Sequence, residues 1–364
     1  MRDCDIRDIY GELLDKAAAK KIPIWSHMDM SYRCNLSCVH CYCQGLSPEF
    51  SGGKPELSLD ERKGLLDELA EAGALHLAIS GGEVLLHPDF FEVAHYAKKN
   101  HFCVSIFTNG TLLDRTAALR IKEISPRMVA LSIYGSTPDV HDSVTRCEGS
   151  FHGTMRAIKL LKDLGLRVEL RSVIMEQNYR QADGIEALSK AVGADDYSFN
   201  IEISRKNDGS SSTQHCQMRD ETIRSFMKER SGFLPEGGHR YEVEPLKRPL
   251  CATGLLVCYI SPYGDVYPCI QLLRSMGNIR EKSFKEIWHG RSELRCELEE
   301  LKTYGDIPPC RVCAYLDSCT FCMGIAFSET GDMKRCYNTL KLISGTEHEI
   351  ALSKKGGSYG KKDI

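Results

Sequence analysis

The chain has 364 residues, of which 42% are hydrophobic, and a formal net charge of -3 at pH 7. This length fits a barrel-sized catalytic domain plus a module of about 100 residues, and the near-neutral charge gives no overall attraction to nucleic acid or to an anionic membrane. Acidic residues interrupt the segment from Met1 to Lys21, and no later run approaches about 18 apolar residues, which excludes a secretory signal and a membrane-spanning helix. We therefore expect a cytoplasmic protein with no membrane and no nucleic-acid partner.

The first expected element is a helix over Arg7–Lys20. From Ile24 to Ser204, short apolar and β-branched runs then alternate with longer amphipathic stretches, which is typical of repeated β-α units around a parallel sheet. The predicted strands are Ser26–Tyr32, His76–Ser80, Cys103–Phe107, Met128–Tyr134, Arg167–Ile174 and Tyr197–Ile203. The predicted helices between them are Ser58–Ala72, Asp89–Lys99, Arg115–Glu123, Gly153–Leu164 and Arg180–Ala191. Six such units are compatible with a partial barrel or with a doubly wound sheet.

The remaining part of the chain changes character twice. Residues 207–250 are polar and rich in turn-forming residues, and predict a linker with one helix near Met218–Arg230. From Cys251 to Cys336 there are many cysteines and little periodicity, which indicates loops shaped by bound metal, and the end beyond about Ser353 predicts disorder. The expected organisation is an N-terminal helix (1–23), an α/β domain (24–206), a linker with a helix (207–250), a cysteine-rich domain (251–340) and a C-terminal tail (341–364).

Seventeen cysteines are an odd and large number for a chain without an export signal. In a reducing compartment such thiols stay unpaired unless a metal binds them. Disulfides are the alternative, but three groups of these cysteines have the short spacings of metal ligands.

The first group is Cys34, Cys38 and Cys41, which follow the first predicted strand with three and then two residues between them. Three thiolates on a four-iron cluster leave one iron open, and an open iron can bind the amino and carboxylate groups of a substrate. The alternative is a zinc site with His40 or Cys43 as its fourth ligand.

These cysteines match the C-x3-C-x2-C loop of radical S-adenosylmethionine enzymes, which the sequence resembles from about Ile24 to Arg205. His40 lies at the loop position usually held by an aromatic residue, and Ser80-Gly81-Gly82-Glu83 follows the second strand, as the Gly-Gly-Glu motif of that family does. The further matches are Phe107–Gly110, Leu131–Gly135, His141, Asp142, Thr145 and Gly149–Phe151.

The resemblance implies an α/β fold in which a partial (β/α)6 barrel is followed by a loop-rich iron–sulfur domain, with the cofactor at the carboxyl ends of the strands. The implied contacts to S-adenosylmethionine are His40, Gly81, Gly82, Glu83, Thr108, Asn109, Ser132 and Arg171. An ordinary strand-to-loop turn is the alternative for the two glycines, and a structural ion pair is the alternative for Arg171.

Eight further cysteines lie in the last third of the chain, in the order Cys251-x6-Cys258-x10-Cys269, Cys310-x2-Cys313-x5-Cys319-x2-Cys322 and Cys336. Eight thiolates are enough for two four-iron clusters, and two zinc ribbons are the alternative from spacing alone. The pattern resembles the SPASM extension, which carries auxiliary clusters in a subset of radical S-adenosylmethionine enzymes. It departs from that pattern at Cys319 and Cys322, which have two residues between them where three are usual.

The resemblance implies one auxiliary cluster at Cys251, Cys258, Cys269 and Cys322, and an outer one at Cys310, Cys313, Cys319 and Cys336. With the first group this makes three [4Fe-4S] clusters. The cysteines left over, for which a buried structural role is expected, are Cys4, Cys43, Cys103, Cys147, Cys216 and Cys296.

The implied reaction is the reductive cleavage of S-adenosylmethionine to a 5'-deoxyadenosyl radical, which abstracts a hydrogen atom from the substrate. The expected substrate is a ribosomally made peptide or a protein, by analogy with many SPASM-bearing enzymes. The alternatives are a small molecule such as a porphyrin-like precursor and, outside enzymes, a zinc- or cluster-binding interaction module. A low-potential electron donor such as ferredoxin or flavodoxin is the implied redox partner. No catalytic residue is predicted.

The sequence departs from related enzymes at two points, and both narrow the expected function. Sulfatase-maturing enzymes carry an aspartate after the cysteine of the Gly-x4-Cys element, whereas this chain has Ile270 there, so we do not expect sulfatase maturation. Many peptide-modifying relatives begin with a leader-binding fold of about 80 residues, whereas 33 residues precede Cys34 here. We therefore expect weak substrate binding by the enzyme alone, with either a separate leader-binding protein or recognition of the core sequence inside the barrel.

Overall fold

The computed structural model describes residues 6–43, 53–231 and 244–356. The chain divides into two compact units, of which the first comprises residues 1–216 and 252–295 and the second residues 217–251 and 296–364. The cysteine-rich segment therefore does not form one body, because its first part belongs to the unit that contains the α/β repeats.

Unit 1 is built on one nine-stranded sheet with the order β6-β5-β4-β3-β2-β1-β7-β8-β9. Its strands are β1 (Trp25–Asp29), β2 (His76–Ser80), β3 (Cys103–Thr108), β4 (Met128–Ser132), β5 (Val168–Val173), β6 (Asp196–Asn200), β7 (Val257–Ile260), β8 (Asp265–Tyr267) and β9 (Gly277–Asn278). The strands from β6 to β7 run parallel, and β8 and β9 add an antiparallel extension. Within the described residues the sheet does not close, because β6 and β9 form its two ends. The predicted partial barrel is confirmed.

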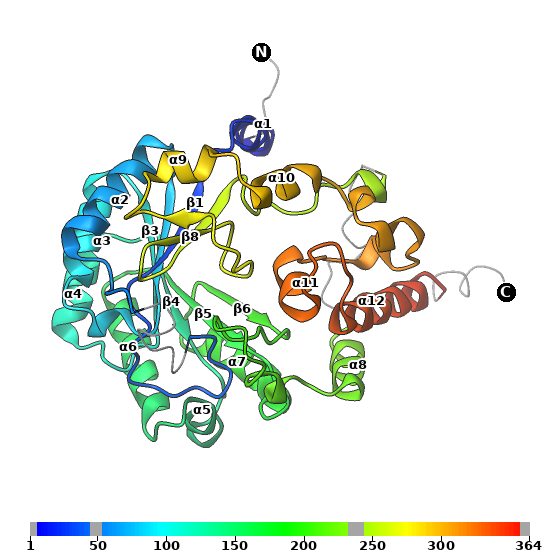
Figure 1. Cartoon of the computed structure of the whole chain (residues 1–364). Helices are drawn as coiled ribbons and strands as arrows, with labels where there is room; N and C mark the ends of the chain where they lie inside the picture. Colours follow the sequence, from blue (N-terminus) through cyan, green and yellow to red (C-terminus); the bar gives the residue numbers. More distant parts are fainter. Residues whose placement is uncertain (1–5, 44–52, 232–243, 357–364) are drawn as a thin grey trace, which may run out of the picture. The chain divides into compact units, whose positions relative to one another are not determined.

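The helices of unit 1 follow the strands in the α/β manner. They are α1 (Ile6–Ala19), α2 (Leu59–Glu71), α3 (Phe90–Lys99), α4 (Arg115–Ile124), α5 (Pro138–Thr145), α6 (Ser150–Asp163), α7 (Ala182–Ala191) and α9 (Phe284–His289), with short 3-10 turns η2 (Val84–Leu86), η3 (Tyr179–Gln181) and η4 (Gln214–Cys216). Helices α2, α3, α4 and α6 line the outer face of the sheet (Figure 1). Helix α2 begins at a reciprocal cap, in which Ser58 and Glu61 each bind the other's backbone N–H.

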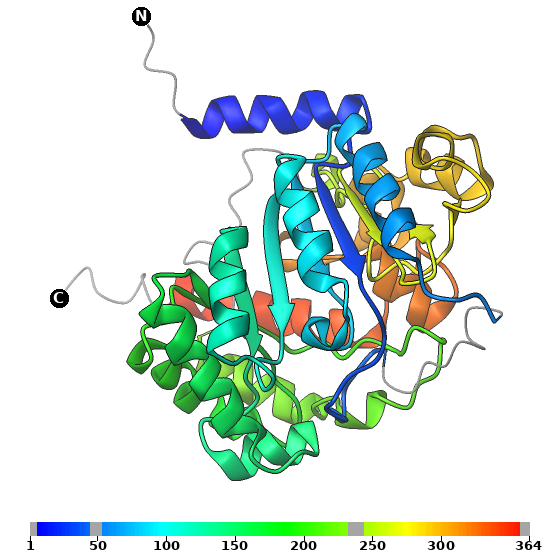
Figure 2. The ribbon, with the colours of Figure 1, turned by 90° about the vertical axis from the view of Figure 1, so that its left-hand side faces the viewer.

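Helix α1 lies across the amino ends of the strands (Figure 2). Its buried Ala17 belongs to one hydrophobic cluster with Ile24 and Leu256. The helix predicted over Arg7–Lys20 therefore covers the end of the sheet opposite to the cysteine loop.

Unit 2 contains more helix than the sequence suggested. Helix α10 (Glu293–Glu300) leads into it, and its other elements are α8 (Asp220–Glu229), α11 (Met323–Thr330), α12 (Asn338–Gly356) and the 3-10 turns η5 (Pro245–Lys247), η6 (Tyr304–Asp306), η7 (Pro308–Val312) and η8 (Leu316–Ser318). Much of the segment predicted as a tail belongs to α12, which packs against α8 and buries Leu340 and Ile350. The disordered end predicted beyond Ser353 falls largely on residues 357–364, outside the described residues. In the part of the chain that the structure describes, no helix has the length and apolar character needed to cross a bilayer.

Candidate functional site

The loop that carries Cys34, Cys38 and Cys41 leaves the carboxyl end of β1 and brings the three thiols together. Burial raises the pKa of Cys34, and Cys41 adds to the rise. Burial likewise raises the pKa of Cys38, with further contributions from Cys41 and Cys34. Each thiol is therefore close enough to feel the charge of the others, as ligands of one cluster must be.

Helix α5, which the sequence did not predict, anchors this loop. The backbone N–H groups of Ser37 and Val39 donate to the carbonyls of Thr145 and Val144 at 3.0 Å. The backbone N–H of Cys41 donates to the carbonyl of Cys38 at 3.1 Å and closes a turn between two of the thiols. The backbone of the loop is thus fixed by hydrogen bonds of its own.

The Gly81-Gly82 pair lies against the chain that leads into the loop. Gly81 has a positive φ of 129°, and a Cβ atom there would lie 2.3 Å from the carbonyl oxygen of Ser31. At Gly82 a Cβ atom would lie 2.1 Å from the carbonyl oxygen of Arg33, and its N–H donates to Ser31 O at 2.7 Å. Side chains are excluded at both positions because two backbone segments are in contact there.

Glu83 connects the ends of β2 and β3. Its buried carboxylate accepts hydrogen bonds from Thr108 Oγ1 at 2.6 Å, from the N–H of Asn109 at 2.8 Å and from the N–H of Leu85 at 3.0 Å. Burial raises the pKa of Glu83, whereas these hydrogen bonds oppose the rise. The carboxylate thus orders the Thr108–Asn109 turn, whose Asn109 Nδ2 lies 3.8 Å from Cys34 Sγ.

The motif that follows β4 holds α5 and α6 together. The Asp142 carboxylate accepts from the N–H of Gly149 at 2.7 Å, from Ser150 Oγ at 2.7 Å and from the N–H of Phe151 at 2.8 Å. It therefore caps the start of α6 from the neighbouring helix. Thr145, whose carbonyl holds the cysteine loop, is 2.7 Å from Ser150 Oγ through its own hydroxyl.

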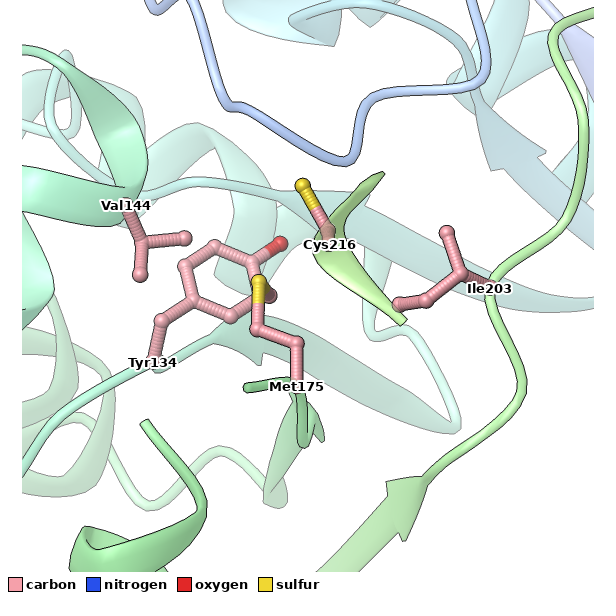
Figure 3. Packing of buried hydrophobic residues seen from close by; sticks show 5 residues of the cluster. All are labelled: Tyr134, Val144, Met175, Ile203 and Cys216. Atoms are coloured by element: carbon pink, nitrogen blue, oxygen red, sulfur yellow. The ribbon is translucent and has the colours of Figure 1, made fainter. Parts of the chain in front are cut away.

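A buried cluster supports the middle of the cysteine loop. It consists of Tyr134, Val144, Met175, Ile203 and Cys216 (Figure 3), and Cys38 and Val39 pack against it. The Cys216 thiol donates to the carbonyl of Val39 at 3.5 Å. Tyr134 was not predicted as a site residue, but burial and the three loop thiols raise the pKa of its phenol.

His40 packs edge-on against the Tyr134 ring, with the ring centroids 4.7 Å apart. Burial lowers the pKa of His40 to about 4, so the ring is neutral at pH 7. Its buried Nδ1 has no hydrogen-bond partner among the described residues. A buried polar atom of this kind fits a polar group of a bound cofactor.

Ser132 and Arg171 are register partners on β4 and β5, and both line a cavity of about 370 Å³ together with Tyr134 and Asn200. Arg171 Nε is 2.7 Å from the Glu169 carboxylate, and its guanidinium lies 4.8 Å above the centre of the Phe107 ring. Its side chain is 46% exposed, so the ion pair orients the guanidinium without burying it.

Four of the later cysteines gather in unit 2. Burial and the neighbouring Cys319, Cys313 and Cys336 raise the pKa of Cys310 to about 12. Burial, with Cys336 and Cys313, raises the pKa of Cys319 to about 11.

The loop between these cysteines is shaped by buried Arg248, which donates to the carbonyls of Leu316 at 2.7 Å and Cys319 at 3.3 Å. The set predicted for the outer cluster is thus assembled within one unit.

The other predicted set is shared between the units. Cys258 and Cys269 belong to unit 1, and Cys251 and Cys322 to unit 2, so this ligand set stays a prediction. Cys258 lies on β7, next to β1, where its thiol donates to Ser26 Oγ at 3.3 Å and burial raises its pKa to about 12.

The donor set fits iron–sulfur clusters. None of the described cysteines forms a disulfide. No group of three or more His, Cys, Asp or Glu side chains in the described ranges is arranged to hold a metal ion. A four-iron cluster binds its thiolates through four separate irons, so its cysteines do not converge on one point as the ligands of a single ion do.

One polar network near the loop was missed by the sequence analysis. Asp29, at the end of β1, is completely buried and accepts a hydrogen bond from Tyr259 at 2.9 Å. The Tyr259 hydroxyl is also 2.8 Å from that of Tyr32, and burial and Asp29 raise the pKa of Tyr259. The sequence signal for this network was an acidic residue within a predicted strand.

Comparisons with known proteins agree with this geometry. Residues 28–187 match the radical SAM superfamily, and residues 251–314 match the iron–sulfur cluster-binding domain called SPASM. The chain is 29% identical over 332 residues to the AdoMet-dependent heme synthase of Methanosarcina barkeri, covering 84% of this chain and 92% of that protein. It is 30% identical over 329 residues to the mycofactocin maturase MftC of Mycobacterium tuberculosis, covering 84% of this chain and 79% of the maturase.

Among solved structures, Streptococcus suis SuiB shares the fold. Its complex with S-adenosylmethionine has a TM-score of 0.67 at 16% identity and covers 93% of this chain and 84% of SuiB. Its complex with the precursor peptide SuiA has a TM-score of 0.66 at 14% identity, covering 93% of this chain and 82% of SuiB. The chain belongs to the radical SAM superfamily and carries a SPASM domain. It is accordingly an enzyme that uses S-adenosylmethionine and iron–sulfur clusters.

Proposed function

We propose that this enzyme modifies a ribosomally made peptide or a protein side chain by abstracting a hydrogen atom from it. The observation that carries the proposal is the likeness to a maturase over 84% of the chain, combined with the fold of an enzyme solved with its precursor peptide. The reaction class follows from the family, and the substrate class is the proposed part.

Cys34, Cys38 and Cys41 are the proposed ligands of the cluster that binds S-adenosylmethionine. When bound, this cluster supplies one electron to the sulfonium and thereby a radical that abstracts hydrogen. His40, Gly81, Gly82, Glu83, Thr108, Asn109, Ser132 and Arg171 are the proposed surroundings of the cofactor. The exposed guanidinium of Arg171 can pair with a carboxylate or a ribose hydroxyl, whereas Glu83 acts indirectly, by fixing the turn at Thr108–Asn109.

The eight later cysteines are proposed to hold two auxiliary clusters, which makes three clusters in all. The effects of Cys313 and Cys336 on the pKa values of Cys310 and Cys319 support the outer set. A low-potential carrier such as ferredoxin or flavodoxin is the proposed electron donor.

A second candidate is a porphyrin-like small molecule. It is favoured by the likeness to a heme synthase, of which the chain covers 92%. Both candidates use the same cofactor, so they differ only in the substrate that the enzyme binds.

The test compares two substrates in parallel. Anaerobically reconstituted enzyme, S-adenosylmethionine and a strong reductant are incubated either with iron coproporphyrin III or with peptides synthesised from small open reading frames beside the gene. Mass spectrometry follows 5'-deoxyadenosine and the mass of each substrate. Enzyme in which Cys34, Cys38 and Cys41 are replaced by serine is the control.

We expect a mass change in a peptide that depends on the cofactor and is absent with the control enzyme. A loss of carbon dioxide from iron coproporphyrin III, with every peptide unchanged, would instead establish the second candidate.

A further inference from the structure

Asp29 is a buried carboxyl residue whose hydrogen-bond partners among the described residues are two phenols and one imidazole. Its carboxylate is fully buried at the end of β1 and accepts hydrogen bonds from the phenols of Tyr259 at 2.9 Å and Tyr42 at 3.4 Å. The third partner that the structure gives it is His27, whose Nε2 lies 3.1 Å from Asp29 Oδ1. Both phenols donate their O–H to Asp29, so hydrogen-bond donors surround the carboxyl group at this buried position.

The same network reaches the cysteine loop. Tyr42 lies between Cys41 and Cys43, and its side chain turns from the loop towards Asp29. Tyr32 and Cys43 form a hydrophobic cluster with Tyr263, against which Cys41 and Tyr42 pack. The Tyr32 hydroxyl joins the network through Tyr259 at 2.8 Å. Aromatic and sulfur atoms thus fill the space between the carboxylate and the loop.

A fixed charge in such surroundings acts on a redox centre nearby. Reduction adds one negative charge to a cluster, and a buried carboxylate opposes that addition because little water or salt screens it. At an effective dielectric constant of about 20, two unit charges about 10 Å apart change an equilibrium constant by roughly tenfold. Cluster potentials respond to net charge and to solvent exposure in this way.

We propose that the buried charge of Asp29 lowers the reduction potential of the cluster at Cys34, Cys38 and Cys41, and so makes the reduced cluster a stronger reductant of S-adenosylmethionine. The inference rests on the proposed ligand role of these three cysteines. Asp29 is a positioning and electrostatic residue here, since its hydrogen bonds are to His27, Tyr42 and Tyr259 and not to the thiols. The side chain of His27 is 21% exposed and its Nε2 lies 3.1 Å from Asp29 Oδ1.

The test is a redox titration of the reconstituted holoenzyme without substrate. The EPR signal of the reduced cluster is followed against potential, and the signal that changes when S-adenosylmethionine is added identifies the cluster concerned. Asp29→Asn removes the charge and keeps the shape. The matched control is Asp67→Asn, because the exposed Asp67 accepts a phenol hydrogen bond from Tyr96 at 2.9 Å on the outer surface of unit 1.

We expect Asp29→Asn to favour reduction about tenfold, which is a shift of about 59 mV to more positive potential for a one-electron couple, and Asp67→Asn to leave the potential unchanged. Tyr259→Phe keeps the charge and is expected to shift the potential much less. Equal potentials for wild type and Asp29→Asn would overturn the proposal, and so would a shift in Tyr259→Phe as large as that in Asp29→Asn, since the effect would then be structural.

A second variant covers the case in which Asp29→Asn fails to assemble its clusters. His27→Lys places a permanent positive charge beside Asp29 at a partly exposed position, and is expected to shift the potential in the same positive direction. An unchanged or more negative potential in His27→Lys would refute the proposal by itself. Because no substrate is present, an error in the proposed substrate class leaves these results untouched. A complete lack of any EPR signal sensitive to S-adenosylmethionine would instead count against the proposed cluster ligands.

Discussion

The Glu83 carboxylate accepts a hydrogen bond from the backbone N–H of Asn109 at 2.8 Å, which ties the carboxyl end of β3 to that of β2. The conservative change Glu83→Gln replaces one acceptor oxygen by an amide donor, which would face either Thr108 Oγ1 and the N–H of Leu85 or the N–H of Asn109. We expect a cost of about 1–3 kcal/mol in stability and weaker cofactor binding. Thermal unfolding and equilibrium dialysis with labelled S-adenosylmethionine measure the two effects. Glu92→Gln, on the exposed surface, should change neither, and equal behaviour of both variants would contradict the role of Glu83.

The cysteine loop gives the next prediction. Replacing Cys34, Cys38 and Cys41 together by serine should remove about a third of the iron, because one of three four-iron clusters is lost. Formation of 5'-deoxyadenosine under a strong reductant should cease. Iron analysis and chromatography measure both quantities, and Cys103→Ser, on β3, is the control. Continued release of 5'-deoxyadenosine by the triple variant would show that these thiols do not hold the cluster.

We expect Arg171 to contribute to the affinity of the enzyme for S-adenosylmethionine. Its guanidinium lines the cavity next to Ser132 and is exposed enough to meet a charged ligand. We expect Arg171→Ala to weaken the binding of S-adenosylmethionine by about tenfold, the effect of losing one charge-assisted hydrogen bond. Arg180→Ala, which removes an exposed arginine stacked on Tyr179, is the control. Unchanged affinity in Arg171→Ala would leave the residue with its structural contacts alone, the ion pair to Glu169 and the stacking on Phe107.

The contact between α2 and the segment after β9 predicts a pH dependence. Arg280 binds the Glu61 carboxylate through two nitrogens, at 2.5 and 2.9 Å, and lowers the pKa of Glu61 to about 2. A carboxyl whose pKa is lowered by folding stabilises the folded state above its unfolded pKa of about 4.3, and this stability is lost as the pH falls towards 2. We expect Arg280→Met to cost at most about 1 kcal/mol at pH 7, because the pair is partly exposed, and less at pH 3.5. Urea unfolding at the two pH values measures the difference, and a constant or growing difference would contradict the assignment.

The residue after Cys269 bears on whether the enzyme can mature sulfatases. Ile270 cannot accept a proton, so we expect no formylglycine when the enzyme is incubated with a cysteine-containing sulfatase peptide. Mass spectrometry detects the aldehyde directly. Its appearance would mean that another side chain serves as the base.

Much of unit 1 could be predicted from periodicity. The bounds of β2 agree with the predicted strand, and the other five predicted strands differ from the observed ones by a few residues at their ends. Strand β7 was missed because it has only four residues and includes Cys258, so the cysteine spacing dominates the local pattern. Helix α5 was missed because it is short and its apolar residues are few.

The site was predictable to the extent that it lies in local motifs. The cysteine loop and the Gly-Gly-Glu turn are each continuous in sequence, so their spacing carries the information. The network around Asp29 is not continuous in sequence, because Tyr259 lies 230 residues further along the chain. Only folding brings these two residues together. Helix α12 was taken for a tail because its charged residues hide the apolar positions that pack against α8.

The pairing of β7 with β1 has a consequence for any attempt to divide the chain. Trp25–Met28 on β1 are register partners of Val257–Ile260, so a polypeptide that stops after residue 206 would expose a row of unsatisfied N–H and C=O groups along β1. Unprotected strand edges of this kind recruit other chains and lead to aggregation. The region matched by the radical SAM superfamily, residues 28–187, therefore depends on the hairpin of β7 and β8, which begins at Val257, to cover the edge of its sheet.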